Sequence, residues 1–134
     1  MDFILVIFNW ALYGNNFSIS HFASINREKI YYKVYGNGDP LLLLYGNNEN
    51  IASFSEQIGP LAKKFQVIAV NTRGHGNNTA NYTALYSYDL FAEDMTQLMD
   101  TLGLKDANIL GWSDGGYTGL QTDYPEKYRS LCTS

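Results

Sequence analysis

The sequence is short of the residues that form cross-links, bind metals or transfer protons. Its 134 residues include one cysteine, Cys132, and two histidines, His21 and His75. A single cysteine excludes an internal disulfide and a cysteine pair for metal or redox chemistry. The histidines share no metal-ligand spacing with each other or with a carboxylate, so we expect neither a metal site nor a cofactor.

Basic residues are also few. Nine lysines and arginines stand against 13 aspartates and glutamates, which gives a formal net charge of −4. No basic patch stands out, and this disfavours nucleic-acid binding. Hydrophobic residues make up 46% of the chain and aromatic residues 15%. Such a composition is typical of a globular protein, and the length suits one domain with a real core.

No apolar run is long enough to cross a membrane. The most apolar stretch, residues 3–13, is too short for a membrane span. It resembles the core of a secretory signal, but Asp2 stands where basic residues are usual; the alternative is an added strand or helix packed on the body. We therefore divide the chain into an N-terminal apolar segment, residues 1–18, and a main domain, residues 19–134. A cytoplasmic location is favoured, with secretion the alternative if residues 3–13 are a signal.

Five short segments predict strands. The first two are joined by a polar turn, and the second alternates between apolar and polar positions, as an antiparallel strand with one buried face does. The other three are mainly apolar, and residues 41–44 are continuously so, which is typical of strands buried on both faces in a parallel sheet. The five segments are residues 22–25, 30–35, 41–44, 67–70 and 107–110.

Three segments with apolar residues at helical spacing follow the buried strands: residues 51–64, 87–103 and 115–123. Gly59-Pro60 predicts a kink or restart in the first. In the second, Ser87 is a good N-cap and Gly103 a plausible C′ glycine, while acidic residues such as Asp94 are expected on the solvent face. Alternating strands and helices predict an α/β fold with a mostly parallel sheet, helices on both faces, and ligands at the carboxyl ends of the strands.

The last predicted strand leads into Gly111-Trp112-Ser113-Asp114-Gly115-Gly116, a Gly-x-Ser-x-Gly signature. In such a strand-to-helix turn the serine has a strained backbone and an exposed Oγ, and the glycines let other backbone pass closely. The helix behind it directs N–H groups towards developing negative charge. Alone, the signature arises by chance in roughly one chain in twenty of this length. A glycine-rich turn with a capping serine is the structural alternative.

Three further stretches strengthen the signature. Residues 38–47, 67–76 and 94–104 resemble the oxyanion loop, the Asp-x-Arg-Gly-x-Gly segment and the helix before the nucleophile in the α/β-hydrolase family. Residues 111–116 resemble its nucleophile elbow, in the variant of valacyclovir-hydrolase-like and other small-ester serine hydrolases. The four motifs keep the family's order and spacing over about residues 22–131. The resemblance implies an α/β-hydrolase-type sheet, truncated after the nucleophile strand and helix, so that strand 107–110 would be a bare edge.

The resemblance also implies roles for individual residues. Ser113 would be the nucleophile that forms an acyl-enzyme with a small-molecule ester or related acyl substrate. The backbone N–H of Asp114 would be one oxyanion donor, and the N–H of Asn47 the second. Tyr45 replaces the family's loop histidine. Asn71 replaces a usual aspartate, which removes a charge that could pair with Arg73.

The family's catalytic triad is incomplete in this sequence. It runs serine, acid, histidine along the chain, yet no histidine follows Ser113. His75 is the remaining candidate base, and its alternative is a surface loop residue. Two hypotheses therefore stay open: a serine hydrolase that needs further residues for activity, and a catalytically inactive fragment or binding relic of the same fold.

Overall fold

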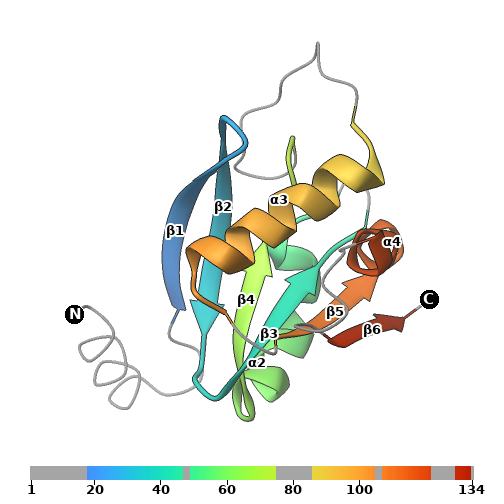
Figure 1. Ribbon diagram of the computed structural model, residues 1–134. Coiled ribbons are helices and arrows are strands. Elements are labelled where there is room, and N and C mark those ends of the chain that lie inside the picture. Colours follow the sequence, from blue (N-terminus) through green and yellow to red (C-terminus); the bar gives the residue numbers. More distant parts are fainter. Residues whose placement is uncertain (1–17, 47–48, 75–85, 105–106, 122–128, 134) are drawn as a thin grey trace.

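The computed structural model describes residues 18–46, 49–74, 86–104, 107–121 and 129–133. They form a six-stranded sheet in the order β1-β2-β4-β3-β5-β6 (Figure 1). The hairpin β1–β2 joins β4 antiparallel, whereas β4, β3, β5 and β6 run parallel. The strands are β1 (Ser18–Ile25), β2 (Glu28–Tyr35), β3 (Asp39–Leu44), β4 (Phe65–Val70), β5 (Asn108–Trp112) and β6 (Arg129–Thr133).

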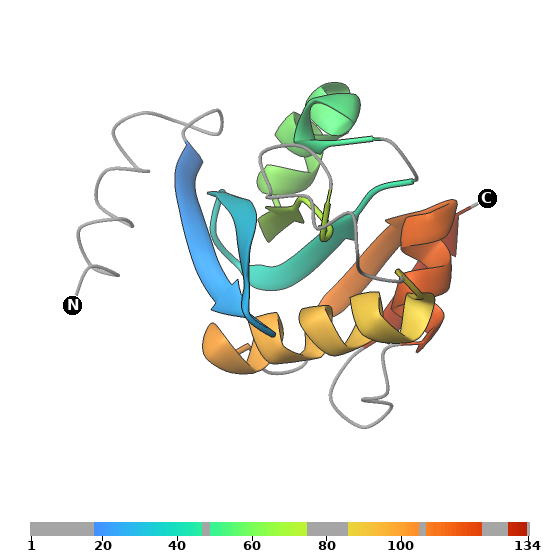
Figure 2. The ribbon, with the colours of Figure 1, turned by 90° about the horizontal axis from the view of Figure 1, so that it is seen from above.

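Helices cover both faces of the sheet, as the sequence predicts. The 3-10 helix η1 (Ile51–Phe54) and α2 (Ser55–Ala62) lie on one face. On the other face lie α3 (Tyr88–Thr101) and α4 (Asp114–Gln121), which pack against each other (Figure 2). The connections after β3 and after β5 thus lead to opposite faces. A crevice at the carboxyl ends of these two neighbouring strands follows from this topology.

The central strand β3 supplies the core on both faces. Leu42 and Leu44 pack with Met95 of α3, whereas Leu41 and Leu43 pack with the α2 side, and all four leucines are buried. A strand enclosed by two helical layers has no solvent face, so its side chains need no polar alternation. This explains why the run at residues 41–44 is continuously apolar.

The predicted ends of α3 match the structure, whereas one predicted break inside α2 does not. Ser87 Oγ accepts a hydrogen bond from Leu90 N at 3.1 Å, and Gly103 follows α3 with a φ of +65°. Of the two alternatives predicted at Gly59-Pro60, the restart is wrong, because α2 continues through both residues, whereas the kink stays a prediction. The change from 3-10 to α geometry comes earlier, at Phe54, whose N-cap position has no side-chain hydrogen bond.

The expectation of a bare edge at the last predicted strand is wrong. β6 pairs in parallel with the full length of β5. Its sequence, Arg-Ser-Leu-Cys-Thr, has neither a continuous apolar run nor a clear alternation. The pattern that reveals buried strands was therefore absent. The prediction for the N-terminal apolar segment lies outside the described residues except at Ser18, where β1 begins.

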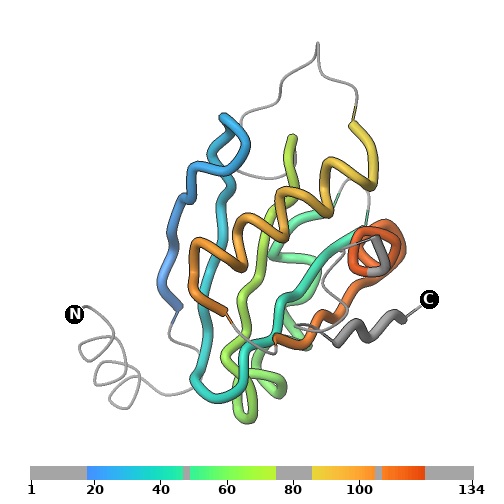
Figure 3. Tube along the Cα trace, viewed as in Figure 1, coloured from blue at the N-terminus to red at the C-terminus, as the bar shows by residue number. Residues whose placement is uncertain are grey.

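A buried ion pair joins three separate parts of the chain. Arg73, in the loop after β4, donates from Nε and Nη2 to the two carboxylate oxygens of Asp94 on α3, at 2.9 and 2.8 Å. Arg73 also lies 3.5 Å from Glu28, and Asn26 Nδ2 donates to Asp94 Oδ1 at 2.8 Å. Figure 3 traces the two segments that this last bond joins, the β1–β2 turn in blue and α3 in yellow to orange.

The prediction that Asp94 lies on the solvent face of its helix is therefore wrong. Its exposed fraction is 0%. A carboxylate at such a position is stable only when it is paired and hydrogen-bonded. Arg73 and Asn26 supply those bonds from segments distant in sequence, which helical spacing does not reveal.

Candidate functional site at the β5–α4 turn

Ser113 stands at the junction of β5 and α4 in a left-handed backbone conformation, with a φ of +53°. Its carbonyl oxygen accepts the N–H groups of Gly116 at 2.9 Å and Tyr117 at 3.2 Å. These bonds form the first turn of α4, which begins directly after the serine. Ser113 itself is exposed. Asp114 is the first residue of α4, so its N–H lies outside the helix's own hydrogen-bond pattern.

Two glycines allow this turn to pack closely against the sheet. A Cβ at Gly111 would lie 2.4 Å from the carbonyl oxygen of Gly115. A Cβ at Gly115 would lie 2.4 Å from the carbonyl oxygen of Leu44 in β3. Both distances are far below van der Waals contact with rigid backbone atoms. Glycine at these positions therefore sets how close Ser113 comes to the end of β3.

The loop after β3 lies against the serine. A Cβ placed on Gly46 would be 3.3 Å from Ser113 Cβ and 2.9 Å from Glu49 Oε2. The N–H of Gly46 donates to Glu49 Oε2 at 2.9 Å, and the N–H of Glu49 donates to the Gly46 carbonyl at 3.3 Å. Asn47, the predicted second oxyanion donor, lies outside the described residues. The residue before it is nevertheless beside Ser113.

Asn71 connects this loop to the loop after β4. Its Oδ1 accepts the N–H of Ile51, the first residue of η1, at 3.2 Å, and both residues are buried. An amide oxygen can accept this bond without a charge, so the asparagine in place of an aspartate still makes the connection. The neighbouring Arg73 takes its charge partners elsewhere, from Asp94 and Glu28.

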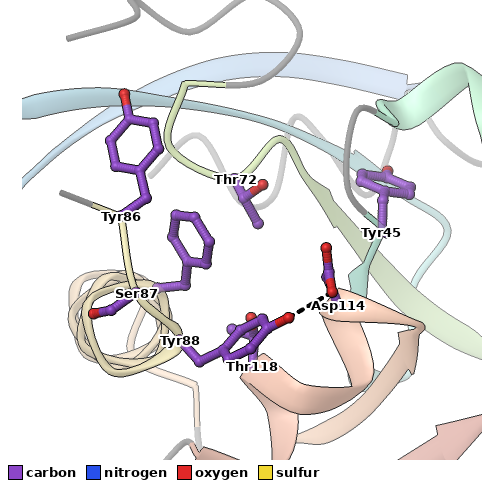
Figure 4. Close-up of a pocket in the computed structure, with 9 residues that line it drawn as sticks. Tyr45, Thr72, Tyr86, Ser87, Tyr88, Asp114 and Thr118 are labelled. Carbon is purple, nitrogen blue, oxygen red and sulfur yellow. Dashed lines mark hydrogen bonds between the residues drawn. The ribbon is translucent and has the colours of Figure 1, made fainter. Parts of the chain in front are cut away.

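A cavity of about 430 Å³ opens beside the serine (Figure 4). It begins at Gly46 and Asp114, which both adjoin Ser113, and its other walls are mainly aromatic and hydroxyl side chains. Tyr88 Oη donates to Asp114 Oδ1 at 2.6 Å, and this hydrogen bond raises the pKa of Tyr88 above its ordinary value. The lining residues are Tyr45, Gly46, Thr72, Tyr86, Ser87, Tyr88, Phe91, Asp114 and Thr118.

Tyr45 supports the loop from inside the core. Its exposed fraction is 2%, and its ring packs on Phe54 with 5.0 Å between the ring centroids. Its hydroxyl is buried and has no hydrogen-bond partner among the described residues. Burial, with a smaller contribution from Tyr35, raises the pKa of Tyr45 far above its ordinary range. Tyr45 thus fills space at the position of the family's loop histidine, and its hydroxyl holds its proton more firmly than that of an ordinary tyrosine.

Neither histidine is placed at the serine by the described structure. His21 is an exposed residue of β1 that stacks on Tyr32, with 5.2 Å between ring centroids. Three strands separate β1 from β5, a distance of about 19 Å at the usual strand spacing. His75, the candidate base, lies outside the described residues. Among the described residues no cluster of histidine, cysteine or carboxylate side chains is suited to a metal ion.

Sequence reasoning missed the aromatic wall and Glu49. Tyr86, Tyr88 and Phe91 come from the start of α3, which returns to the edge of the sheet where Ser113 lies. The capping Ser87 was the available signal for this wall, because it marks where the helix starts. It does not show which edge of the sheet that start faces. The three-residue separation of Gly46 and Glu49 is compatible with a turn, yet is too common to be diagnostic. No helix in the described part of the chain is long and apolar enough to span a membrane.

Curated proteins with similar sequences include hydrolases, a dehalogenase, a lactonase and non-heme chloroperoxidases. A fluoroacetate dehalogenase from a Burkholderia species is 34% identical over 104 residues, which cover 73% of this chain and 34% of the dehalogenase. A serine hydrolase of Homo sapiens is 33% identical over 118 residues, which cover 82% of this chain and 39% of that protein. The chain thus spans little more than a third of the length of these two relatives.

Solved structures agree on the fold. The N-acyl homoserine lactonase AidH shares 34% identity with a TM-score of 0.79, over 87% of this chain and 45% of the lactonase. The epoxide hydrolase CorEH shares 28% identity with a TM-score of 0.81, over 87% of this chain and 42% of that enzyme. The family model for the alpha/beta hydrolase fold matches residues 39–133, which include β3 to β6 and the Ser113 turn. The chain therefore belongs to the α/β-hydrolase family.

Proposed function

We propose that this chain carries the nucleophile of a serine hydrolase that acts on a small ester or related acyl bond. The observation that carries the proposal is the left-handed backbone of Ser113 at the β5–α4 junction. Such a strained, exposed serine at the start of a helix is the geometry of a nucleophile elbow. The adjoining cavity of about 430 Å³ is of the size that small ligands occupy.

The proposed reaction uses two backbone donors. Ser113 Oγ would attack the carbonyl carbon while its proton passes to a base, and the negative oxygen would be bound by the N–H of Asp114 and the N–H of Asn47. Collapse of this intermediate releases the alcohol or other leaving group and leaves the acyl group on Ser113. Water then attacks the acyl-enzyme, which releases the carboxylic acid and restores the serine.

The described residues do not supply a base for this mechanism. No histidine follows Ser113 in the 134 residues, His21 lies on a distant strand, and the candidate base His75 lies outside the described residues. This observation favours a second candidate function, an inactive scaffold or binding relic that keeps the site's shape without its chemistry. An unactivated serine hydroxyl is a poor nucleophile, so the two candidates differ in the reactivity of one atom.

A fluorophosphonate probe measures that reactivity directly. We expect the probe to label the wild-type chain and to leave Ser113→Ala unlabelled, as judged by intact-protein mass spectrometry. Ser24→Ala is the matched control, because Ser24 is an exposed serine on β1 and its loss should not change labelling. Absence of label on the wild-type chain would reject catalysis by this chain and favour the inactive scaffold.

A further inference from the structure

Glu49 is a carboxylate beside the proposed nucleophile that the mechanism above does not use. If Gly46 carried a Cβ, that atom would lie 2.9 Å from Glu49 Oε2 and 3.3 Å from Ser113 Cβ. Glu49 is partly buried, and its side chain accepts the N–H of the buried Gly46. It therefore lies on the side of the loop that faces the Ser113 turn.

Two hydrogen bonds join Glu49 to Gly46 in opposite directions. The Gly46 N–H donates to the carboxylate at 2.9 Å, and the Glu49 N–H donates to the Gly46 carbonyl at 3.3 Å. A bond to an ionised acceptor is stronger than one between neutral groups. On the far side of Glu49, Asn50 caps η1 and Asn71 holds Ile51. The described parts of the loop are thus fixed at both ends.

The bond to Glu49 also decides which backbone donors are free. Because the Gly46 N–H is occupied by the carboxylate, it is not available to an oxyanion. The second donor of the proposed site must then come from beyond Gly46, which agrees with the role proposed for the N–H of Asn47.

We propose that Glu49 is a positioning residue of the acyl-transfer site: its carboxylate holds Gly46, at the start of the loop after β3, against Ser113. The inference rests on the proposed function. It assigns the role to the acceptor oxygen of Glu49 and not to its charge. Glutamine keeps that acceptor and alanine removes it, so the two variants separate the possibilities.

Two measurements on the full chain test the inference. Hydrogen exchange followed by NMR reports the Gly46 N–H directly, and the rate of fluorophosphonate labelling reports Ser113. In Glu49→Ala we expect Gly46 to exchange about tenfold faster or more, and labelling to slow by a similar factor, because a charge-assisted bond is lost. In Glu49→Gln both rates should stay within about threefold of wild type, since a neutral bond replaces it.

Glu56→Ala is the matched control, because Glu56 is an exposed glutamate on the neighbouring α2 and should change neither rate. Unchanged Gly46 exchange in Glu49→Ala, or slow labelling in both Glu49 variants, would overturn the inference while the wild type still labels. Faster Gly46 exchange in a chain that never labels would mean that Glu49 closes the loop but that the proposed hydrolase function has failed.

Discussion

Ser113 adopts a backbone conformation that costs most L-residues about 1–2 kcal/mol. Its φ of +53° is maintained because α4 and the end of β3 enclose the turn. Strain of this kind is held at a site by the packing around it. The cost belongs to the backbone and not to the hydroxyl, so it can be separated from any role in chemistry.

Replacing Ser113 by glycine or alanine tests this separation. Both variants remove the hydroxyl, but only glycine adopts a positive φ without penalty. We expect Ser113→Gly to have a free energy of unfolding about 1 kcal/mol higher than Ser113→Ala, measured by urea denaturation. Equal stabilities would show that the turn is not strained.

The hydroxyl of Tyr45 provides a second test at a single residue. It is buried without a partner among the described residues, and an unsatisfied polar group of this kind costs about 1–3 kcal/mol. Tyr45→Phe should therefore raise the free energy of unfolding by about 1 kcal/mol. Tyr117→Phe is the control, because Tyr117 is 58% exposed and its loss should change little. A destabilised Tyr45→Phe would reveal a partner for the hydroxyl.

At the scale of elements, the β1–β2 hairpin turns on two residues with positive φ, Asn26 at 47° and Arg27 at 67°. This is the geometry of a two-residue turn that favours Asn-Gly. Asparagine is at the favoured position and also bonds Asp94, whereas Arg27 is exposed and pays the steric cost of its Cβ.

Arg27→Gly should accordingly stabilise the protein by about 0.5 kcal/mol, the relief of strain less the added freedom of the unfolded chain. Asn26→Gly suits the backbone equally well but removes the amide bond to Asp94, so it should destabilise by about 1 kcal/mol. Thermal or chemical unfolding of both variants measures these changes in stability. Stabilisation by both substitutions would mean that turn geometry alone controls the hairpin.

The predictability of the elements depended on whether their pattern is local. Residues 41–44 and 67–70 are continuously apolar and residues 107–110 nearly so, because these strands lie between helical layers, and all three were found. β6 lacks that pattern and is a strand because it pairs with β5. A local pattern search therefore missed it. The Ser113 turn was predictable because its residues are contiguous. The aromatic wall and Glu49 were not, because the fold brings them to the serine from other segments.

At the scale of the whole molecule, the Arg73–Asp94 pair joins the loop after β4, the β1–β2 hairpin and α3. Side-chain exposure is 6% at Arg73 and 1% at Asp94. Removing one member of such a pair leaves the other charge buried and unpaired, which costs more than the pair contributes.

Arg73→Ala and Asp94→Ala should each lower the free energy of unfolding by about 3 kcal/mol or more. The double variant should lose clearly less than the two single losses combined, because no charge is then left alone. A double-mutant cycle by urea denaturation measures the coupling. Additive losses would mean that the two side chains act independently.

The contact between Gly115 and the Leu44 carbonyl limits how this sequence can vary. Every missense change at codon 115 introduces a Cβ that would lie only 2.4 Å from the backbone carbonyl oxygen of Leu44. Gly59, in α2, has open space at the same test position and pays no such steric cost on substitution. Two glycines in helices of one chain therefore stand at opposite extremes of mutational tolerance, and what separates them is whether another segment of backbone passes behind.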